Sequence, residues 1–260
     1  MIQPVCYRKK LEGKSNAHLI TFDDGRNYVV KFFQEGFERT LPNEWISYCL
    51  ARYLDLPVPY AQIIEIPQTF VSQTPELSQV ATSQFQFASL YIQDCLDGHE
   101  VTEVPNILNH DKLAGIIVFD YWLSNHDRTR KNILLREESP SSYRLWMIDQ
   151  AEVLGSYNWQ LSDLEKMNTK LLKSATHKLI AGFIKDEQEF DDYIELTQTI
   201  PIFLIEEIVS IIPDEWLVSK EEKKAIVSAL VTRRNKVLPK LIKQFIKKVY
   251  LPLPKKCSDS

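Results

Sequence analysis

The sequence has little glycine and no long uninterrupted apolar run. Only 7 of its 260 residues are glycine, which argues against a fold that depends on several glycine-rich loops. No segment approaches the roughly 18 apolar residues of a membrane-spanning helix, and the N-terminus has no apolar run of signal-peptide length. We therefore expect a cytoplasmic protein without a transmembrane segment.

An excess of positive charge and closely paired cysteines are also lacking. The formal net charge is −4, whereas a protein whose main partner is nucleic acid usually has a basic footprint that neutralises phosphates. The cysteines are scattered without a C-x-x-C pair, at Cys6, Cys49, Cys95 and Cys257. A chain of this size with 44% hydrophobic residues can bury a core without disulfides. We expect free thiols and no nucleic acid as the main partner.

The first third of the chain predicts an antiparallel β-meander. β-prone runs at 5–8, 18–22 and 27–33 are separated by turn-rich residues, of which Asp23 to Arg26 are typical of a hairpin turn. These runs are short and rich in branched and aromatic residues. The chain therefore begins as a small sheet.

The first turn of this meander contains Gly13, Ser15 and Asn16. A P-loop would need a further glycine at the position of Arg8, so that motif is excluded. A looser hairpin loop can still present backbone N–H groups to phosphates. An ordinary polar turn explains the same residues, and both interpretations stay open.

Lys31 and Glu44 form a second candidate for phosphate binding. In an alternating strand Lys31 shares a face with Val29 and Phe33, and a lysine on a half-buried face needs an anionic partner. Glu44 begins an amphipathic helix over 44–54, just after Pro42. Kinases use a strand lysine and a helix glutamate in this order. A solvated lysine and a glutamate that complements the helix dipole are the alternatives.

The middle of the chain predicts two further strands and one buried helix. Residues 60–66 and 85–95 have strand composition, the stretch 67–84 between them has the composition of a loop, and 107–124 alternates with helical spacing. In the order of a two-lobed kinase, the strand ending at Cys95 leads into the interlobe hinge. Backbone groups near Gln93 are then expected beside adenine.

Three polar residues around 125–149 carry the main prediction. Asp127 and Asn132 have the spacing D-x-x-x-x-N, and two expected strands over 132–136 and 143–148 return Asp149 beside Asn132. Phosphoryl transfer needs a carboxylate that takes the hydroxyl proton and oxygen ligands that hold Mg²⁺ against the phosphates. We predict Asp127 as the base and Asn132 and Asp149 as metal ligands for ATP.

Three basic residues in the same loop suggest a further role. Arg128, Arg130 and Lys131 follow Asp127 directly. We interpret them as groups that neutralise phosphate charge.

These residues resemble a known family. Asn125-x-Asp127-Arg128-x-x-x-Asn132 followed by Met147-Ile148-Asp149 resembles the HipA-like kinases and, more distantly, the phosphatidylinositol kinases. The likeness extends to 13–33, to Asn43-Glu44 and to 212–216, and thus over roughly the whole chain. It implies a two-lobed fold, ATP with Mg²⁺ as cofactors, and Ser or Thr of a protein substrate as the acceptor.

We therefore expect an α+β, two-lobed protein-kinase-like fold. An antiparallel β-rich nucleotide-binding lobe spans 1–96, a mostly helical catalytic lobe spans 97–250, and 251–260 form a tail. The last helix, over 221–249, has a break near Pro239 and a basic face. That face contains Arg233, Arg234, Lys236, Lys240, Lys243, Lys247 and Lys248. It is either a solvated face or a surface for an anionic partner.

Other functions remain as alternatives. His110-Asp111 and His126-Asp127 allow a metal-dependent phosphohydrolase of the HD type, which needs additional His and Asp ligands on helices. A non-catalytic nucleotide-binding or scaffold module of the same fold is another alternative. A kinase whose acceptor is a lipid or a small metabolite is a third.

Overall fold

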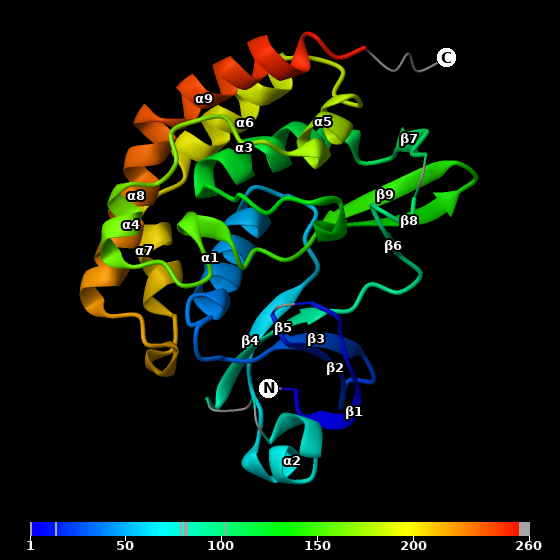
Figure 1. Ribbon diagram of the computed structural model, residues 1–260, viewed down its shortest axis with the longest axis vertical. Coiled ribbons are helices and arrows are strands. Elements are labelled where there is room, and N and C mark those ends of the chain that lie inside the picture. The colour runs from blue at the N-terminus through cyan, green and yellow to red at the C-terminus, as the bar shows by residue number, and fades with distance from the viewer. Residues whose placement is uncertain (1, 14, 79, 81–82, 102, 255–260) are drawn as a thin grey trace.

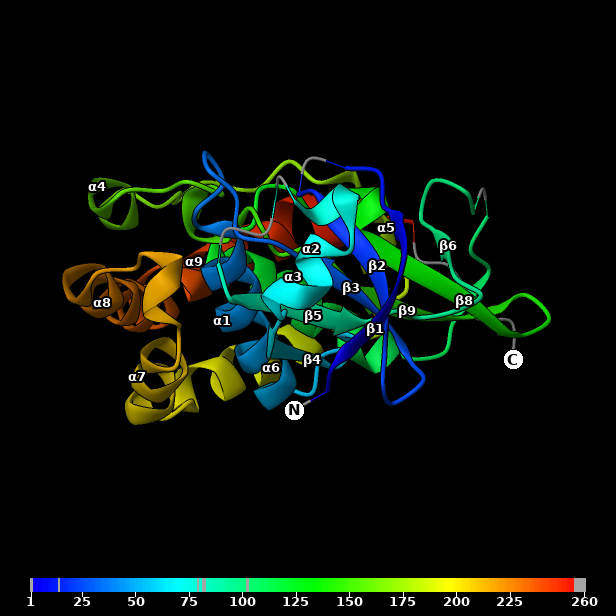
Figure 2. The same cartoon turned by 90° about the horizontal axis from the view of Figure 1, so that it is seen from below.

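The computed structural model describes residues 2–13, 15–78, 80, 83–101 and 103–254. Figure 1 shows two parts: a sheet built from the N-terminal third, and a helical part built mainly from the C-terminal half. A β-hairpin from the middle of the chain projects to one side (Figure 2). The predicted α+β architecture with a β-rich part and a helical part is confirmed.

The N-terminal sheet is antiparallel and has the strand order β1-β2-β3-β5-β4. Its strands are β1 (Pro4–Lys10), β2 (Ala17–Phe22), β3 (Asn27–Lys31), β4 (Ala61–Glu65) and β5 (Phe85–Leu90). The predicted meander is therefore confirmed. The two faces of β3 differ as the alternation predicts: Val30 packs into a core with Ile20 and Phe22, whereas Val29 and Lys31 face a cavity.

Two predictions for this region are wrong. β5 ends at Leu90 and does not reach Cys95, because its partner β3 has no residue beyond Asn27, whose carbonyl accepts from the Tyr91 N–H at 2.9 Å. The stretch 67–84 is not simply a loop. It contains α2 (Gln68–Ser72) and a 3₁₀ turn, η1 (Pro75–Leu77), which cover the outer face of the sheet through Val71 and Leu77.

The second sheet has the strand order β6-β8-β9-β7. Its strands are β6 (Leu96–Asp97), β7 (Asn106–Ile107), β8 (Ile133–Ser139) and β9 (Ser142–Met147). β8 and β9 are antiparallel with Ile133 opposite Met147, so the Ile148 N–H reaches the Asn132 carbonyl at 3.1 Å. The predicted return of the chain to Asn132 is confirmed. The expected division at 96/97 falls inside β6, which pairs with β8.

Nine α-helices are found in the described part of the chain, together with short 3₁₀ turns. Besides α2 they are α1 (Thr40–Tyr53), α3 (Leu113–Leu123), α4 (Leu161–Glu165), α5 (Ala175–Ala181), α6 (Gln188–Thr199), α7 (Ile202–Ser210), α8 (Lys220–Lys236) and α9 (Leu238–Phe245). The remaining turns are η2 (His110–Lys112), η3 (Arg130–Asn132), η4 (Val153–Gly155), η5 (Asp214–Trp216) and a π-helical turn, η6 (Ile246–Tyr250). Every residue of α3 is buried, so this helix forms the rigid centre of the helical part.

The predicted break in the last helix is confirmed, but its basic face is smaller than predicted. α8 ends at Lys236 because Pro239 has no N–H with which to continue the helical ladder. Arg233 and Arg234 are buried and bind carbonyls: Arg233 reaches Tyr121 and Trp122 at 2.8 Å each, and Arg234 reaches Ile200 at 2.5 Å. They satisfy carbonyls at helix ends, which would otherwise be buried without partners.

Buried polar contacts join α1 to the helical part. Arg39, next to the first residue of α1, donates to the Leu217 carbonyl at 2.9 Å and to the Glu222 carboxylate at 2.5 Å. Asn43 Nδ2 donates to the carbonyls of Ala151, Val153 and Ser156 at 2.7, 3.1 and 3.0 Å. These bonds fix α1 against the segment that follows β9.

Two further observations bear on the environment of the protein. No helix in the described residues is long and apolar enough to cross a membrane. Cys6, Cys49 and Cys95 are free thiols, and Cys257 lies outside the described residues.

Candidate active site

Lys31, Glu44 and Asp149 meet although they come from three distant segments. Lys31 is the last residue of β3, Glu44 lies in the first turns of α1, and Asp149 follows β9. The Lys31 ammonium donates to Glu44 Oε1 and to Asp149 Oδ1, the latter at 2.7 Å. Lys31 is only 7% exposed and Glu44 4%. The predicted pairing of the strand lysine with the helix glutamate is present in the structure.

The pKa values in this triad follow from burial and from one shared cation. Burial alone would lower the pKa of Lys31, but the charges of Asp149 and Glu44 outweigh it and raise that pKa. Burial would raise the pKa of Asp149, but the charge and hydrogen bond of Lys31 lower it. Burial raises the pKa of Glu44, the charge of Lys31 offsets this only in part, and the nearby charge of Asp149 raises the pKa further. At neutral pH the charged Lys31 ammonium therefore lies between the side chains of Glu44 and Asp149.

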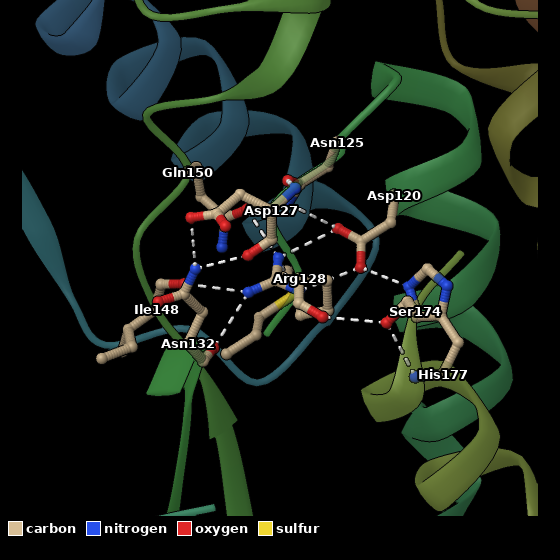
Figure 3. Close-up of polar contacts among 10 residues, drawn as sticks. Asp120, Asn125, Asp127, Arg128, Asn132, Ile148, Gln150, Ser174 and His177 are labelled. Carbon is tan, nitrogen blue, oxygen red and sulfur yellow. Dashed lines mark hydrogen bonds and ion pairs between the residues drawn. The ribbon is translucent and has the colours of Figure 1, made fainter. Parts of the chain in front are cut away.

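Asp127 and Asn132 are held together on the loop after α3. Asn132 Nδ2 donates to the Asp127 carbonyl at 2.5 Å and to Asp127 Oδ2 at 3.0 Å (Figure 3). The Asp127 N–H in turn donates to Asn125 Oδ1 at 3.0 Å. These bonds fix the direction of the Asp127 carboxylate, which is half-buried and reachable from solvent.

The donor set fits a hard cation that is shared with phosphates. Both contacts of the Asn132 amide use its nitrogen, so its oxygen is left as a ligand, and Asp149 uses only Oδ1 for Lys31. Asn132 and Asp149 are adjacent because the Ile148 N–H binds the Asn132 carbonyl. No group of three or more His, Cys, Asp and Glu ligands gathers anywhere in the described residues. Mg²⁺ commonly takes few protein oxygens and completes its shell with phosphates and water.

A cavity of about 400 Å³ lies between the N-terminal sheet and the second sheet. Its apolar walls contain Val29, Tyr48, Val58, Ala61, Phe87, Leu134 and Met147. Lys31, Glu44 and Asp149 lie at its polar end, and Lys131 lines it as well. An apolar slot that ends in a cation and acids has the character of a small-molecule site.

The structure places the predicted nucleotide-binding residues unequally around this cavity. Ser15 lines it, whereas Gly13 and Asn16 are in the same turn but do not. Tyr91 and Ile92 line it, whereas Gln93 is exposed just beyond them, because β5 ends earlier than predicted. The roles of these residues stay predictions.

The interpretation of Arg128 as a phosphate-neutralising group is wrong. Arg128 is 2% exposed and forms a bidentate ion pair with Asp120, from Nε and Nη2, at 2.9 Å each (Figure 3). Its Nη1 donates to the carbonyls of Asn132 and Ile148 at 2.9 Å each. Arg128 is therefore a buried structural residue that holds the chain at Asn132 and the chain at Ile148 together.

The two other basic residues of the loop differ from each other. Arg130 Nη2 donates to the Val101 carbonyl at 2.8 Å, and Arg130 does not line the cavity. Lys131 is exposed and lines the cavity.

The network around Asp120 was not predicted. Asp120 is fully buried in α3 and accepts from Arg128, from Asn125 at 2.9 Å and from the His177 ring at 2.9 Å. Arg128 and the His177 hydrogen bond overcome the effect of burial and lower the pKa of Asp120. The sequence did contain one signal for this network. Asp120 is a carboxylate within an otherwise apolar helix, and a buried carboxylate needs hydrogen-bond or charged partners.

Gln150 links the Asp120 network to the lysine triad. Its side-chain oxygen accepts from Arg128 at 2.7 Å and from Asn125 at 3.3 Å, and its N–H donates to Glu44 Oε1 at 2.9 Å. Asp149, just before it, has φ 56, a left-handed conformation that is uncommon for a non-glycine residue. This conformation lets the Asp149 carboxylate accept from Lys31 while the next side chain, Gln150, accepts from Arg128.

The alternative of an HD-type metal site does not fit this geometry. His110-Asp111 precede α3 and His126-Asp127 follow it. The 11 residues of α3 span about 16 Å at about 1.5 Å per residue, so the two pairs cannot share one metal ion.

Comparisons with known proteins agree with this geometry. A family model described as HipA-like kinase matches residues 4–247. The structure of the Helicobacter pylori proinflammatory kinase CtkA is similar with a TM-score of 0.60 at 15% identity, covering 95% of this chain and 96% of that one. The Golgi casein kinase with Mn and ADP bound has a TM-score of 0.54 at 10% identity, covering 100% and 78%. No curated protein matches the chain. These likenesses confirm the protein-kinase-like fold.

Proposed function

Since this chain belongs to the HipA-like kinase family, we propose that it transfers the γ-phosphate of ATP, with Mg²⁺, to a serine or threonine hydroxyl of a protein. Membership of the family makes it a protein-kinase-like phosphotransferase. One observation carries the finer proposal: Lys31, Glu44 and Asp149 line one cavity, and Asn132, which holds Asp127, is bonded through its carbonyl to Ile148, next to Asp149.

Each residue has a role that its contacts support. Lys31 binds the nucleotide phosphates, and Glu44 holds the Lys31 ammonium at the end of the cavity. Asn132 and Asp149 would hold Mg²⁺ through the Asn132 amide oxygen and the Asp149 carboxylate; bound there, the ion would offset the negative charge of the phosphates. The apolar walls near Tyr48 receive the adenine ring.

Asp127 acts on the acceptor. Its carboxylate orients the incoming hydroxyl and takes its proton as the oxygen attacks the γ-phosphate, and the ADP oxygen leaves with the bond electrons. The hydrogen bonds from Asn132 fix this carboxylate, and its half-buried position keeps it open to a bulky acceptor. Positioning therefore supplies much of the catalysis.

The test is transfer of labelled phosphate from ATP with Mg²⁺ to the proteins of a cell lysate. Asp127→Asn should lower the transfer rate by about 100-fold to 10,000-fold, the range for loss of a general base. Asp111→Asn is the matched control, because Asp111 also follows a histidine but is exposed at the other end of α3. Equal transfer by wild type and Asp127→Asn would refute the role of Asp127.

Two further outcomes would refute the proposal itself. If saturating ATP and Mg²⁺ do not raise the melting temperature of the protein, it does not bind the nucleotide, and the scaffold alternative holds. Transfer to lipids or metabolites with none to protein would refute the acceptor.

A further inference from the structure

The segment after α4 carries positive charge in an otherwise acidic chain. Residues 166–178 contain no Asp or Glu although the whole chain has a net charge of −4. Their basic side chains are Lys166, Lys170, Lys173 and Lys178. We call residues 166–178 the basic strip.

The basic strip is fixed beside the catalytic loop. The Ser174 hydroxyl donates to the Arg128 carbonyl at 2.8 Å, one residue from Asp127 (Figure 3). The Leu172 N–H donates to the Tyr121 hydroxyl at 3.1 Å, and the Asn168 carbonyl accepts from Arg233 at 2.8 Å. These bonds fix the backbone of the strip relative to the loop of Asp127.

The lysines of the strip are exposed and form no ion pair within the described residues. Lys166, Lys170, Lys173 and Lys178 are all exposed. Across the part of the chain that the structure describes, none of them forms an ion pair. The acidic residues nearest in sequence before the strip, Asp163 and Glu165, lie at its α4 end. Asp163 already accepts from the Gln160 N–H at 2.8 Å. The Ser174 end nearest Asp127 is therefore the more positive one.

We propose that the basic strip binds acidic residues that flank the phosphorylated serine or threonine of a protein substrate. This inference rests on the proposed kinase function and names the class of acceptor. Residues 166–174 of the strip run as an irregular chain from α4 to α5 in Figure 1 and reach the loop of Asp127 at Ser174, whereas 175–178 begin α5. An extended acidic segment laid along it would place its hydroxyl residue at Asp127.

The shape of the strip favours a peptide over a lipid surface. A surface that binds membranes usually combines basic residues with exposed apolar side chains that enter the bilayer. Of the large apolar residues within the strip, Met167 is buried and Leu171 and Leu172 are half-buried, and Leu172 is also held through its backbone. The strip therefore presents a row of positive charges rather than an apolar surface.

The experiment compares kcat/KM for three serine peptides that differ only in the flanking residues: Glu, Gln or Lys. An exposed ion pair contributes a factor of about two to five, so two pairs give about tenfold. The wild type should prefer the Glu peptide to the Gln peptide by about tenfold, mostly through KM. The preference should shrink at high salt because exposed charges are screened.

Charge reversal supplies the decisive variants. Lys170→Glu with Lys173→Glu should remove the preference for the Glu peptide and favour the Lys peptide, with KM for ATP unchanged. Lys240→Glu with Lys243→Glu is the matched control on the exposed face of α9 and should keep the wild-type preference.

The outcomes separate the inference from the proposed function. Equal kcat/KM for the three peptides, or an unchanged preference in the strip variant, overturns the inference while kinase activity stands. Phosphorylation of anionic lipid vesicles in place of the peptides overturns the peptide partner. No transfer to any peptide or protein overturns the proposed function and the inference with it.

Discussion

Replacing Asp120 by Asn should destabilise the protein more than any surface substitution. The variant keeps the shape of the side chain but removes its charge, so the Arg128 guanidinium stays buried without an anion. An amide N–H would also face either Arg128 or His177, both of which approach Asp120 at 2.9 Å. Removal of one partner from a buried ion pair costs about 3–5 kcal/mol. That is a large share of a typical free energy of unfolding of about 5–15 kcal/mol.

The pH dependence gives this prediction a second, independent measure. The pKa of Asp120 is lowered in the folded state, whereas an unfolded aspartate titrates near about 3.9. The contribution of Asp120 is therefore present above about pH 4 and is lost as the pH falls towards the lower folded pKa. The difference in free energy of unfolding between wild type and Asp120→Asn should be full at pH 7 and smaller at pH 3.

Urea unfolding at both pH values measures this difference. Asp111→Asn is again the control and should change the free energy of unfolding by less than about 0.5 kcal/mol. A loss below about 1 kcal/mol for Asp120→Asn at pH 7, or a difference that grows on acidification, would refute the reasoning.

Three further predictions concern other buried titratable or charged residues. Lys31→Met should lower the rate of phosphoryl transfer by about 100-fold or more, since it removes the charge that is proposed to bind the phosphates; single-turnover kinetics with an unchanged circular dichroism spectrum would establish this. Burial lowers the pKa of His18 to about 4, so stability that is present above the unfolded pKa of about 6.5 is lost as the pH falls towards 4. Urea unfolding should show that the wild type loses about 1–3 kcal/mol more than His18→Leu between pH 7 and pH 4.5; parallel pH curves would contradict it. Arg39→Gln should destabilise by about 3 kcal/mol through its buried contacts, whereas the exposed Arg52→Gln on the same helix should not; a thermal melt in which both variants shift equally would argue against this.

The fold and the polar end of the site were largely predictable from the sequence because they depend on local patterns. Alternation in 27–33 put Lys31 on the cavity face, and two short apolar runs returned Asp149 to Asn132. These signals lie in the spacing of neighbouring residues. Spacing constrains which side chains share a face.

The network that supports the site could not be predicted because its partners are distant in sequence. Asp120, Arg128, Gln150 and His177 each look ordinary in their local context, and only the packing of α3, α5 and the chain after β9 brings them together. The sequence position of Arg128 suggested the wrong role, because sequence alone does not show whether an arginine beside the predicted base Asp127 points into the core or towards a phosphate. The end of β5 depended likewise on the length of its partner strand.

The attachment of α1 has a consequence for how such a protein is switched on and off. In many kinases the helix that carries the glutamate swings away, and this separates it from the strand lysine until a signal arrives. Here such a swing would break the bonds of Asn43 to three carbonyls and those of Arg39 to Leu217 and Glu222. At about 1 kcal/mol for each bond, fewer than about one molecule in a thousand would be in the swung-out state at any moment. Because the Lys31–Glu44 pair is already formed, we expect control through the abundance of the protein or the access of the acceptor.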